Sequence, residues 1–416
     1  MKSNYKRIGD FIKQVKVKNT DGRCQQLLGI NIDKYFMPSV ANVVGTNLNK
    51  YKVVKKGQFA CNRMHVGRDY RLPIALSRDS EPFIVSPAYD VFEVVDTKKL
   101  DPEYLMMWFS RSEFDRNSWF YTDTDVRGKL GWDSFCDMEL PVPSIEQQLE
   151  IVAEYNTVTN RIKLNERLNQ KLEETAQALY KHWFVGFEFP NEEGQPYKSS
   201  GGAMVHNDEL DKEIPEGWRS KPVYDIALYV NGGAFKNSDF IQDKSGTPII
   251  KIAELKKGIT DQTNYTNKKC KEEIRIKNGS LLYSWSGNPE TSLEVFKWFG
   301  GNALLNQHIF NLHFNSDQSE CLTYFTLKSL KSQFVQLAAG KQTTGLGHVT
   351  VADLKQLKIA YPSFEDLKKL EKYLRSYYNY DSKIKKENLI LCDLQAVLLS
   401  KMSKVEENMN IEIVEN

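Results

Sequence analysis

The sequence predicts an α+β protein in which two similar mixed α/β domains are separated by two long antiparallel coiled-coil helices, with a pseudo-twofold internal repeat. A phrase of apolar residues and proline occurs at 140–144 and again at 359–363, and a long helical run follows each copy. The two phrases are 219 residues apart (363 minus 144), and 56–59 resembles 278–281 at nearly the same offset. A period this long is too large for a solenoid repeat and indicates a duplicated domain.

Length and composition bound the class of protein. A chain of 416 residues is long enough for two or three domains, each with its own core. No stretch approaches 18 consecutive apolar residues and the N-terminal residues have no apolar signal core, so we expect neither a membrane span nor secretion. The six cysteines form no C-x-x-C pair and are expected to be reduced. These features are typical of a cytoplasmic protein.

The net charge of +2 conceals an uneven distribution. Basic residues outnumber acidic ones up to residue 80, and acidic residues outnumber basic ones from 81 to 143. Segregated positive charge mixed with tyrosine and phenylalanine can follow a phosphate backbone. An ordinary solvated face explains the same pattern equally well.

The chain divides into six predicted segments. They are a first mixed domain at 1–143, a first long helix at 144–185, a linker at 186–213, a second mixed domain at 214–362, a second long helix at 363–405 and an acidic tail at 406–416. In the first domain, 51–54 and 83–85 are strand-like, and the surroundings of 105–109 are helical. The linker is rich in glycine, serine and acidic residues and has no periodicity.

The first long helix is predicted from its start signal and its apolar stripe. Ser144 suits the N-cap and Gln147 suits a capping box. Apolar residues then recur in steps of three and four, with Asn165 on the seam, where a polar residue can fix register. The helix would be roughly 60 Å long and needs a partner to cover its seam.

The second long helix carries a similar stripe and is the expected partner. If the two helices pair antiparallel, the mixed domains lie at opposite ends of a rod; the alternative is two separate surface helices, each packed on its own domain. The residues expected to pair the helices or dock subunits are Ile162, Asn165, Leu168, Leu172, Leu179, Ile384, Leu391, Leu394 and Leu398.

Motifs for catalysis are missing from the sequence. It contains no G-x-x-x-x-G-K-[ST] phosphate loop, no G-x-G-x-x-G turn, no Asn-Pro-Pro-Tyr methyltransferase tetrapeptide and no zinc motif. Residues 254–256 resemble the end of a nuclease motif, but E-x-K arises by chance in a lysine-rich chain. We therefore expect neither catalytic nor metal-binding residues in this chain.

Loops rich in base-reading and phosphate-reading side chains remain, at matching places in both domains. Glutamine and threonine can address base edges, and lysine can address phosphate; for any single residue, a solvated loop is the alternative. The candidate DNA-binding residues are Arg63, His65, Arg68, Arg127, Lys129, Lys236, Asn237, Trp285, Ser286, Asn288, Lys341, Gln342, Thr343, Thr344 and His348.

Four segments, taken together, resemble the specificity subunit of type I restriction–modification systems. The connector at 183–190 and the segment at 214–218 are similar to those that lead into the second recognition domain of such subunits. Residues 143–148 resemble the family's entry into the first helix, and 303–308 resemble its strand with a Gln-His pair. The resemblance spans essentially the whole chain, in the family's order.

The resemblance implies a non-catalytic subunit of an adenine methyltransferase and endonuclease complex that acts in phage defence. Two target recognition domains would each read one half of a split, asymmetric site in double-stranded DNA, and the helices would set the gap. The helices would also dock two modification subunits, which carry the S-adenosylmethionine site, and restriction subunits that use ATP and Mg²⁺ would join them. No cofactor is expected in this chain.

Two other functions stay open at this point. The chain could be the recognition portion of a single-chain restriction–methyltransferase enzyme, although the methyltransferase tetrapeptide is missing from these residues. It could also be a coiled-coil protein adaptor that does not bind DNA.

Overall fold

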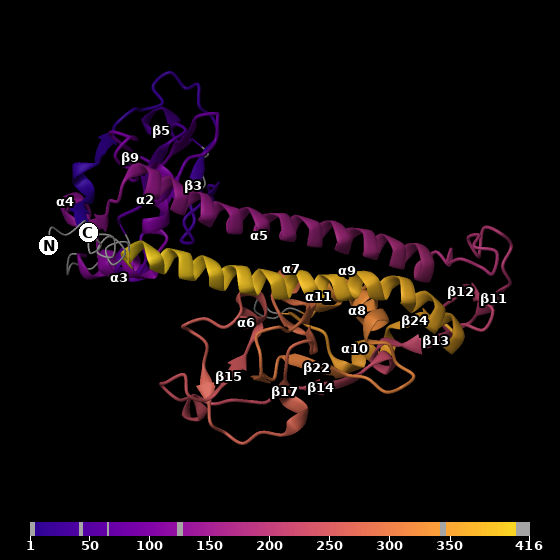
Figure 1. Cartoon of the computed structure of the whole chain (residues 1–416). Coiled ribbons are helices and arrows are strands. Elements are labelled where there is room, and N and C mark those ends of the chain that lie inside the picture. Colours follow the sequence, from indigo (N-terminus) through magenta and orange to yellow (C-terminus); the bar gives the residue numbers. More distant parts are fainter. Residues whose placement is uncertain (1–4, 41–44, 65, 123–127, 342–346, 405–416) are drawn as a thin grey trace, which may run out of the picture. The chain divides into compact units, whose positions relative to one another are not determined.

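The computed structural model describes residues 5–40, 45–64, 66–122, 128–341 and 347–404 (Figure 1). The chain forms two compact units: a first unit of Met1–Lys163 with Ile390–Asn416, and a second unit of Leu164–Leu389. Two long helices, α5 (Ile145–Tyr180) and α11 (Phe364–Lys401), each contribute to both units. In the described ranges, no helix is both long and apolar enough to cross a membrane.

The first unit is built on a four-stranded antiparallel sheet in the order β2-β9-β6-β7. Smaller strand pairs are β1 with β10, β3 with β4, and β5 with β8, and the described part of this unit also contains short helices. The strands are β1 (Tyr5–Arg7), β2 (Ile12–Val15), β3 (Leu28–Ile30), β4 (Phe36–Pro38), β5 (Lys52–Val54), β6 (Gln58–Cys61), β7 (Ile74–Leu76), β8 (Phe83–Val85), β9 (Asp90–Val94) and β10 (Glu139–Pro141), and the helices are α1 (Val66–Asp69), α2 (Pro102–Phe109), α3 (Ser112–Phe120) and α4 (Trp132–Asp137).

Aromatic packing forms the core of the first unit. Phe59 stacks on Phe92 with ring centroids 5.0 Å apart, and Phe109 of α2 meets Phe59 edge-on at 5.8 Å. Helix α2 begins where the Asp101 side chain accepts a hydrogen bond from the Tyr104 amide at 3.0 Å, with proline in the first turn. The predicted strands and the predicted helix of this domain are thus confirmed.

The second unit contains an antiparallel sheet in the order β14-β22-β18-β20 and a mixed sheet in the order β16-β15-β21-β17, in which β15 and β21 are parallel. Shorter pairs are β11 with β12, β13 with β24, and β19 with β23. The strands are β11 (Met204–Asn207), β12 (Lys212–Pro215), β13 (Arg219–Pro222), β14 (Leu228–Asn231), β15 (Thr247–Ile250), β16 (Tyr265–Thr266), β17 (Arg275–Ile276), β18 (Leu281–Ser284), β19 (Ser286–Gly287), β20 (Glu294–Lys297), β21 (Ala303–Leu305), β22 (Ile309–His313), β23 (Gly347–His348) and β24 (Lys358–Tyr361), and the shorter helices are α6 (Ile252–Lys257), α7 (Pro289–Ser292), α8 (Glu320–Ser329), α9 (Lys331–Ala339) and α10 (Val351–Gln356).

The internal repeat is visible where each long helix begins. Strand β10 pairs antiparallel with β1 and leads into α5, and β24 pairs antiparallel with β13 and leads into α11. The Ser144 hydroxyl accepts a hydrogen bond from the Gln147 amide at 3.4 Å, and the Ser363 hydroxyl accepts one from the Asp366 amide at 3.1 Å. Both recurring phrases therefore place a serine N-cap after a strand; the sequence predicted the one at Ser144.

The segment predicted as a linker folds against the second unit. Strands β11 and β12 form a hairpin, and Trp218 stacks on Phe189 with centroids 5.2 Å apart. The Trp218 indole donates a hydrogen bond to the Asp366 carboxylate of α11 at 3.1 Å. The sequence predicted a linker without periodicity, and the structure shows that this segment contributes a stacked aromatic side chain and a hairpin strand to the second unit.

Side-chain hydrogen bonds show that the long helices run antiparallel. In the second unit, Asn165 of α5 donates to Asn388 of α11 at 2.8 Å, and Asn169 donates to Asp381 at 3.0 Å. Numbering rises along α5 as it falls along α11, which is the antiparallel direction. The predicted fold class is confirmed, and the expectation that Asn165 lies on the seam holds, since its residue is only 2% exposed.

The predicted seam is wrong in detail beyond Asn165. Leu168 is 38% exposed, whereas Ala176 is 1% exposed and lies in the core with Tyr180. The buried residues Asn165 and Ala176 are 11 residues apart (176 minus 165), which equals three helical turns of about 3.67 residues each. A seven-residue pattern was expected, so the prediction drifted by one position.

The other pairing candidates divide by burial. Leu168 and Leu394 are exposed and lie outside the buried seam. Ile384 and Leu398 are buried. The half-buried candidates are Ile162, Leu172, Leu179 and Leu391. The alternative was two separate surface helices. In the second unit, α5 and α11 instead pair with each other, and both also pack on the domain.

A buried ion pair joins β20 to α11 in the second unit. The Lys297 ammonium lies 3.1 Å from the Asp381 carboxylate, and the Lys297 side chain is 1% exposed. Burial lowers the pKa of Lys297 to about 8, against the opposing effect of the Asp381 charge. The Lys297 ammonium is still protonated at neutral pH. It loses its proton more readily in the folded chain than a lysine exposed to water does.

The depressed pKa of Lys297 predicts a stability that rises with pH. Between pH 8 and about 10.4, the unfolded chain keeps this proton and the folded chain loses it, so raising the pH favours the fold. From pH 7.5 to pH 10, the free energy of unfolding of the natural chain should gain about 2 kcal/mol relative to Lys297→Met. Urea denaturation of both proteins at each pH measures this difference, and a difference that does not change with pH would contradict the analysis.

Candidate nucleic-acid interface

In the first unit, residues beside the candidates Arg63 and Arg68 meet residues beside the candidate Lys129. The Gly67 amide donates to the Gly128 carbonyl at 2.9 Å, and the Leu130 amide donates to the Arg63 carbonyl at 3.0 Å. A Cβ atom on Gly67 would lie 2.6 Å from the Gly128 Cα, so neither loop has room for a side chain at this crossing.

The matching loops of the second unit meet in the same way. Strand β19 pairs antiparallel with β23, with Gly287 opposite Gly347. The Val349 amide donates to the Trp285 carbonyl at 2.9 Å. A Cβ atom on Gly347 would lie 2.7 Å from the Ala338 carbonyl oxygen, so this loop too is packed at a glycine.

The two loop crossings are equivalent positions of the repeat. Gly128 and Gly347 are 219 residues apart (347 minus 128), and the amide donors Leu130 and Val349 have the same separation (349 minus 130). This offset equals that of the phrases before the long helices. The duplicated domain therefore builds one surface twice, from side chains that differ between the two copies.

Trp285 is the centre of the loop surface in the second unit. Its indole donates to the Asn231 side chain at 3.1 Å, and its ring lies 5.6 Å from His308 and 5.9 Å from His348. The Ser286 hydroxyl lies 2.9 Å from Nδ1 of His348. These contacts hold the half-buried Trp285 and the exposed His348 in place before any ligand arrives, which lowers the entropic cost of binding.

The lysine candidates differ in exposure and in ion pairing. Lys129 and Lys236 are exposed, as is Asn237. Lys341 is exposed but forms an ion pair with Asp353. Burial raises the pKa of Asp353, but hydrogen bonds from Lys341 and Thr350 outweigh it and lower that pKa. Lys341 thus also secures the start of α10, and a phosphate would have to compete with Asp353 for it.

Three candidates have structural partners that the sequence did not reveal. Arg63 is buried, forms an ion pair with Asp90 at 2.7 Å and lies over the Trp132 ring, so its prediction as a DNA contact is corrected to a core role. Asn288 caps α7 with its side chain. Arg68 is exposed and forms an ion pair with the neighbouring Asp69 at 2.7 Å.

Several predictions fall on residues outside the described ranges. They are His65, Arg127, Gln342, Thr343 and Thr344, together with the predicted acidic tail at 406–416. Among the residues that are described, no group of three or more histidine, cysteine, aspartate or glutamate side chains could hold a metal ion.

An exposed aromatic group in the first unit was missed in the sequence. Phe120 is 78% exposed, Trp119 and Tyr121 are also exposed, and Trp119 lies 5.3 Å from the exposed ring of Tyr70. In the sequence, the triplet at 119–121 lies shortly before the candidates Arg127 and Lys129. The sequence feature that could have predicted this group is a run of three adjacent aromatic residues at the end of a polar helix. A helix buries only one face, so part of such a run must be exposed.

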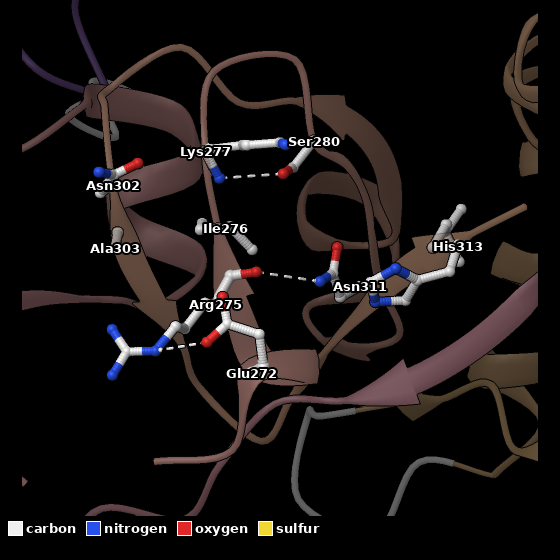
Figure 2. Close-up of a pocket in the computed structure, with 10 residues that line it drawn as sticks. Glu272, Arg275, Ile276, Lys277, Ser280, Asn302, Ala303, Asn311 and His313 are labelled. Carbon is white, nitrogen blue, oxygen red and sulfur yellow. Dashed lines mark hydrogen bonds and ion pairs between the residues drawn. The ribbon is translucent and has the colours of Figure 1, made fainter. Parts of the chain in front are cut away.

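A pocket lies elsewhere in the second unit (Figure 2). It has a volume of about 600 Å³ and is lined by polar and apolar residues of β17, β21, β22 and the neighbouring turns. Figure 2 shows the Arg275 guanidinium turned toward Glu272, with which it forms an ion pair at 3.1 Å. Asn311 donates to the carbonyls of Glu273 and Arg275. None of the predicted site residues lines this pocket.

Comparison with known proteins finds a family match within the second unit. Residues 215–391 match the family model described as the type I restriction modification DNA specificity domain. The chain is 25% identical over 277 residues to the type I restriction enzyme MjaIX specificity subunit of Methanocaldococcus jannaschii, covering 64% of this chain and 60% of that protein. It is 27% identical over 160 residues to the HindI specificity subunit of Haemophilus influenzae, covering 38% and 34%.

The fold agrees with a solved structure. The crystal structure of the type I restriction–modification S subunit from M. genitalium superposes with a TM-score of 0.52 at 14% identity, covering 96% of this chain and 95% of that one. The likeness supports the α+β arrangement. The match at 215–391 is to the same family that the sequence resembles, and the chain spans less than two thirds of the length of the curated relatives named above.

Gly67→Ala should separate the two loops of the first unit. Its Cβ would collide with the Gly128 backbone, so the Gly67 and Leu130 amides should lose protection from hydrogen exchange. Gly57→Ala is the control: Gly57 has a φ of +82° but no atom within 4 Å, so it adds backbone strain without a collision. Unchanged protection of Leu130 in Gly67→Ala would show that the loops do not depend on this crossing.

Proposed function

We propose that this chain, which carries a type I restriction–modification DNA specificity domain at 215–391, is the DNA sequence-recognition subunit of a type I restriction–modification enzyme. It would read a bipartite, asymmetric target in double-stranded DNA. The observation that carries the proposal is the loop crossing that recurs in both units with different side chains. Two similar but non-identical surfaces suit two different half-sites.

The chemistry of the described loops supports contact with DNA. The exposed His348 can exchange hydrogen bonds with base edges, the buried Ser286 hydroxyl holds its ring, and Trp285 presents an aromatic surface. Lys129 and Lys236 are exposed cations that can contact phosphate. Base contacts would give sequence choice, and phosphate contacts would give affinity that falls with salt.

Exposed apolar side chains on the long helices support docking of protein subunits. Ile390 is 68% exposed and Leu164 is 56% exposed, although a helix normally turns such side chains inward. Others are Tyr373, Tyr380, Leu389, Leu394 and Val397. The proposed partners are two modification subunits that bind S-adenosylmethionine and restriction subunits that use ATP and Mg²⁺, in the cytoplasm.

The proposal assigns recognition to this chain and chemistry to its partners. The purified chain should neither methylate nor cut DNA, because its sequence lacks the motifs for either reaction. Together with the modification subunits, it should direct methylation of adenine at a bipartite target, while the modification subunits alone should not. These three mixtures can be compared by incorporation of labelled methyl groups.

The other outcomes distinguish the alternative functions. Methylation or cleavage by the chain alone would make it part of a single-chain enzyme. A complex that assembles but does not retard any DNA in a gel would make the chain a protein adaptor.

Lengthening both helices should lengthen the gap between the half-sites. Because Asn165 pairs with Asn388 and Asn169 pairs with Asp381, four residues must be inserted in each helix, after Leu168 and after Lys386. Four residues add about 6 Å, and B-DNA rises about 3.4 Å per base pair. The methylated target should therefore gain one or two base pairs of spacer with both half-sites unchanged.

The control for this insertion is the same four residues added to α5 alone. That variant leaves the seam out of register and should lose stability. An active complex with both insertions and an unaltered spacer would show that the helices do not set the distance.

A further inference from the structure

Lys297 attaches the sheet of the second unit to α11 through several directed contacts. Besides the ion pair with Asp381, its ammonium donates to the Tyr378 carbonyl at 2.6 Å and to the Ser382 hydroxyl at 3.3 Å. It also lies 3.2 Å from the centroid of the Tyr378 ring. All four interactions can form together only when α11 has one particular rotation about its axis and one particular position along its axis relative to β20.

The same network continues to α5. The Asp381 carboxylate accepts a hydrogen bond from Asn169 of α5 as well as the ion pair from β20. A second link runs from Tyr324 of α8, whose hydroxyl donates to the Glu173 carboxylate of α5 at 2.8 Å. The domain and both helices are therefore connected by buried or half-buried polar groups.

Buried charge is an inefficient way to gain stability. Removing two ions from water costs several kcal/mol each, and apolar residues of similar size often serve as well. A buried ion pair instead specifies one relative position of the two elements that it joins. Apolar side chains tolerate a small shift between packed elements, whereas a buried charge does not. A slip of one residue along α11 moves a side chain by about 1.5 Å and turns it by about 100°. Asp381 would then no longer face Lys297.

We propose that Lys297 and Asp381 are positioning residues that fix the register of the second recognition domain on α5 and α11, and that they thereby determine the spacer length at which the second half-site is read. This inference rests on the proposed function. The pair touches no DNA; it acts by holding the domain that does. Its loss relaxes the choice of spacer and leaves the choice of bases unchanged.

The test is Lys297→Met with Asp381→Asn in the complex with modification subunits. Methionine keeps the length of the buried stem, and asparagine keeps the shape and the acceptor for Asn169. Methylation is measured on targets with the natural spacer and with spacers one base pair longer and shorter. The preference of the natural complex for its own spacer should fall at least tenfold in the variant, with both half-site sequences still required.

A matched control is Lys171→Met with Glu174→Gln. This exposed ion pair, with a separation of 2.7 Å, lies within α5 and connects it to no other element. Its removal changes the same charges near the same place and should leave spacer choice unaltered. A folded Lys297→Met/Asp381→Asn complex with the natural spacer preference would overturn the inference.

Two further measurements keep the outcomes separate. Circular dichroism and thermal melting establish that the double variant is folded; if it is not, Asp381→Asn alone takes its place and the same two outcomes apply. If the natural complex methylates no bipartite target, the proposed function itself fails. If the natural complex methylates a bipartite target and the variant keeps the same spacer preference, the proposed function stands and only the positioning role is wrong.

Discussion

The antiparallel pairing of α5 and α11 is the constraint on which the rest of this structure depends. Each helix begins at a serine N-cap that follows an edge strand, so each continues directly from its own domain. In the second unit the pairing is fixed by Asn165 and Asn169, which hydrogen-bond across the seam to Asn388 and Asp381. A purely apolar seam would be more stable, but it would specify one register less strictly.

The duplicated domains meet the helices through cores that are continuous with them. In the second unit, Ala176 and Tyr180 of α5 belong to the same apolar cluster as Leu370 and Leu374 of α11 and the aromatic side chains of the domain. In the second unit, the loops that cross at glycine thus belong to a domain whose core continues into both helices. Such support suits recognition, because a preorganised surface loses little entropy when it binds.

The sequence predicted the repeat, the two helices and Asn165 correctly, because these depend on local signals and on periodicity. It failed at Leu168, where a seven-residue period departs from the natural turn of the helix, and at Arg63, where only the fold brings Asp90 and Trp132 to the guanidinium. It also could not foresee that Lys297 would meet Asp381, since that contact joins residues 84 positions apart (381 minus 297). Loop residues were found as a class, but their individual partners required the tertiary structure.

The central claim is that one chain carries two independent readers of DNA at a set distance. The most direct measurement maps methylated adenines in the DNA of cells that carry this chain with its modification subunits and compares them with cells lacking only this chain. The account predicts a motif of two unlike short sequences separated by a constant number of unspecified bases, present only with the chain. A continuous motif, a variable gap, or the same methylation without the chain would contradict it.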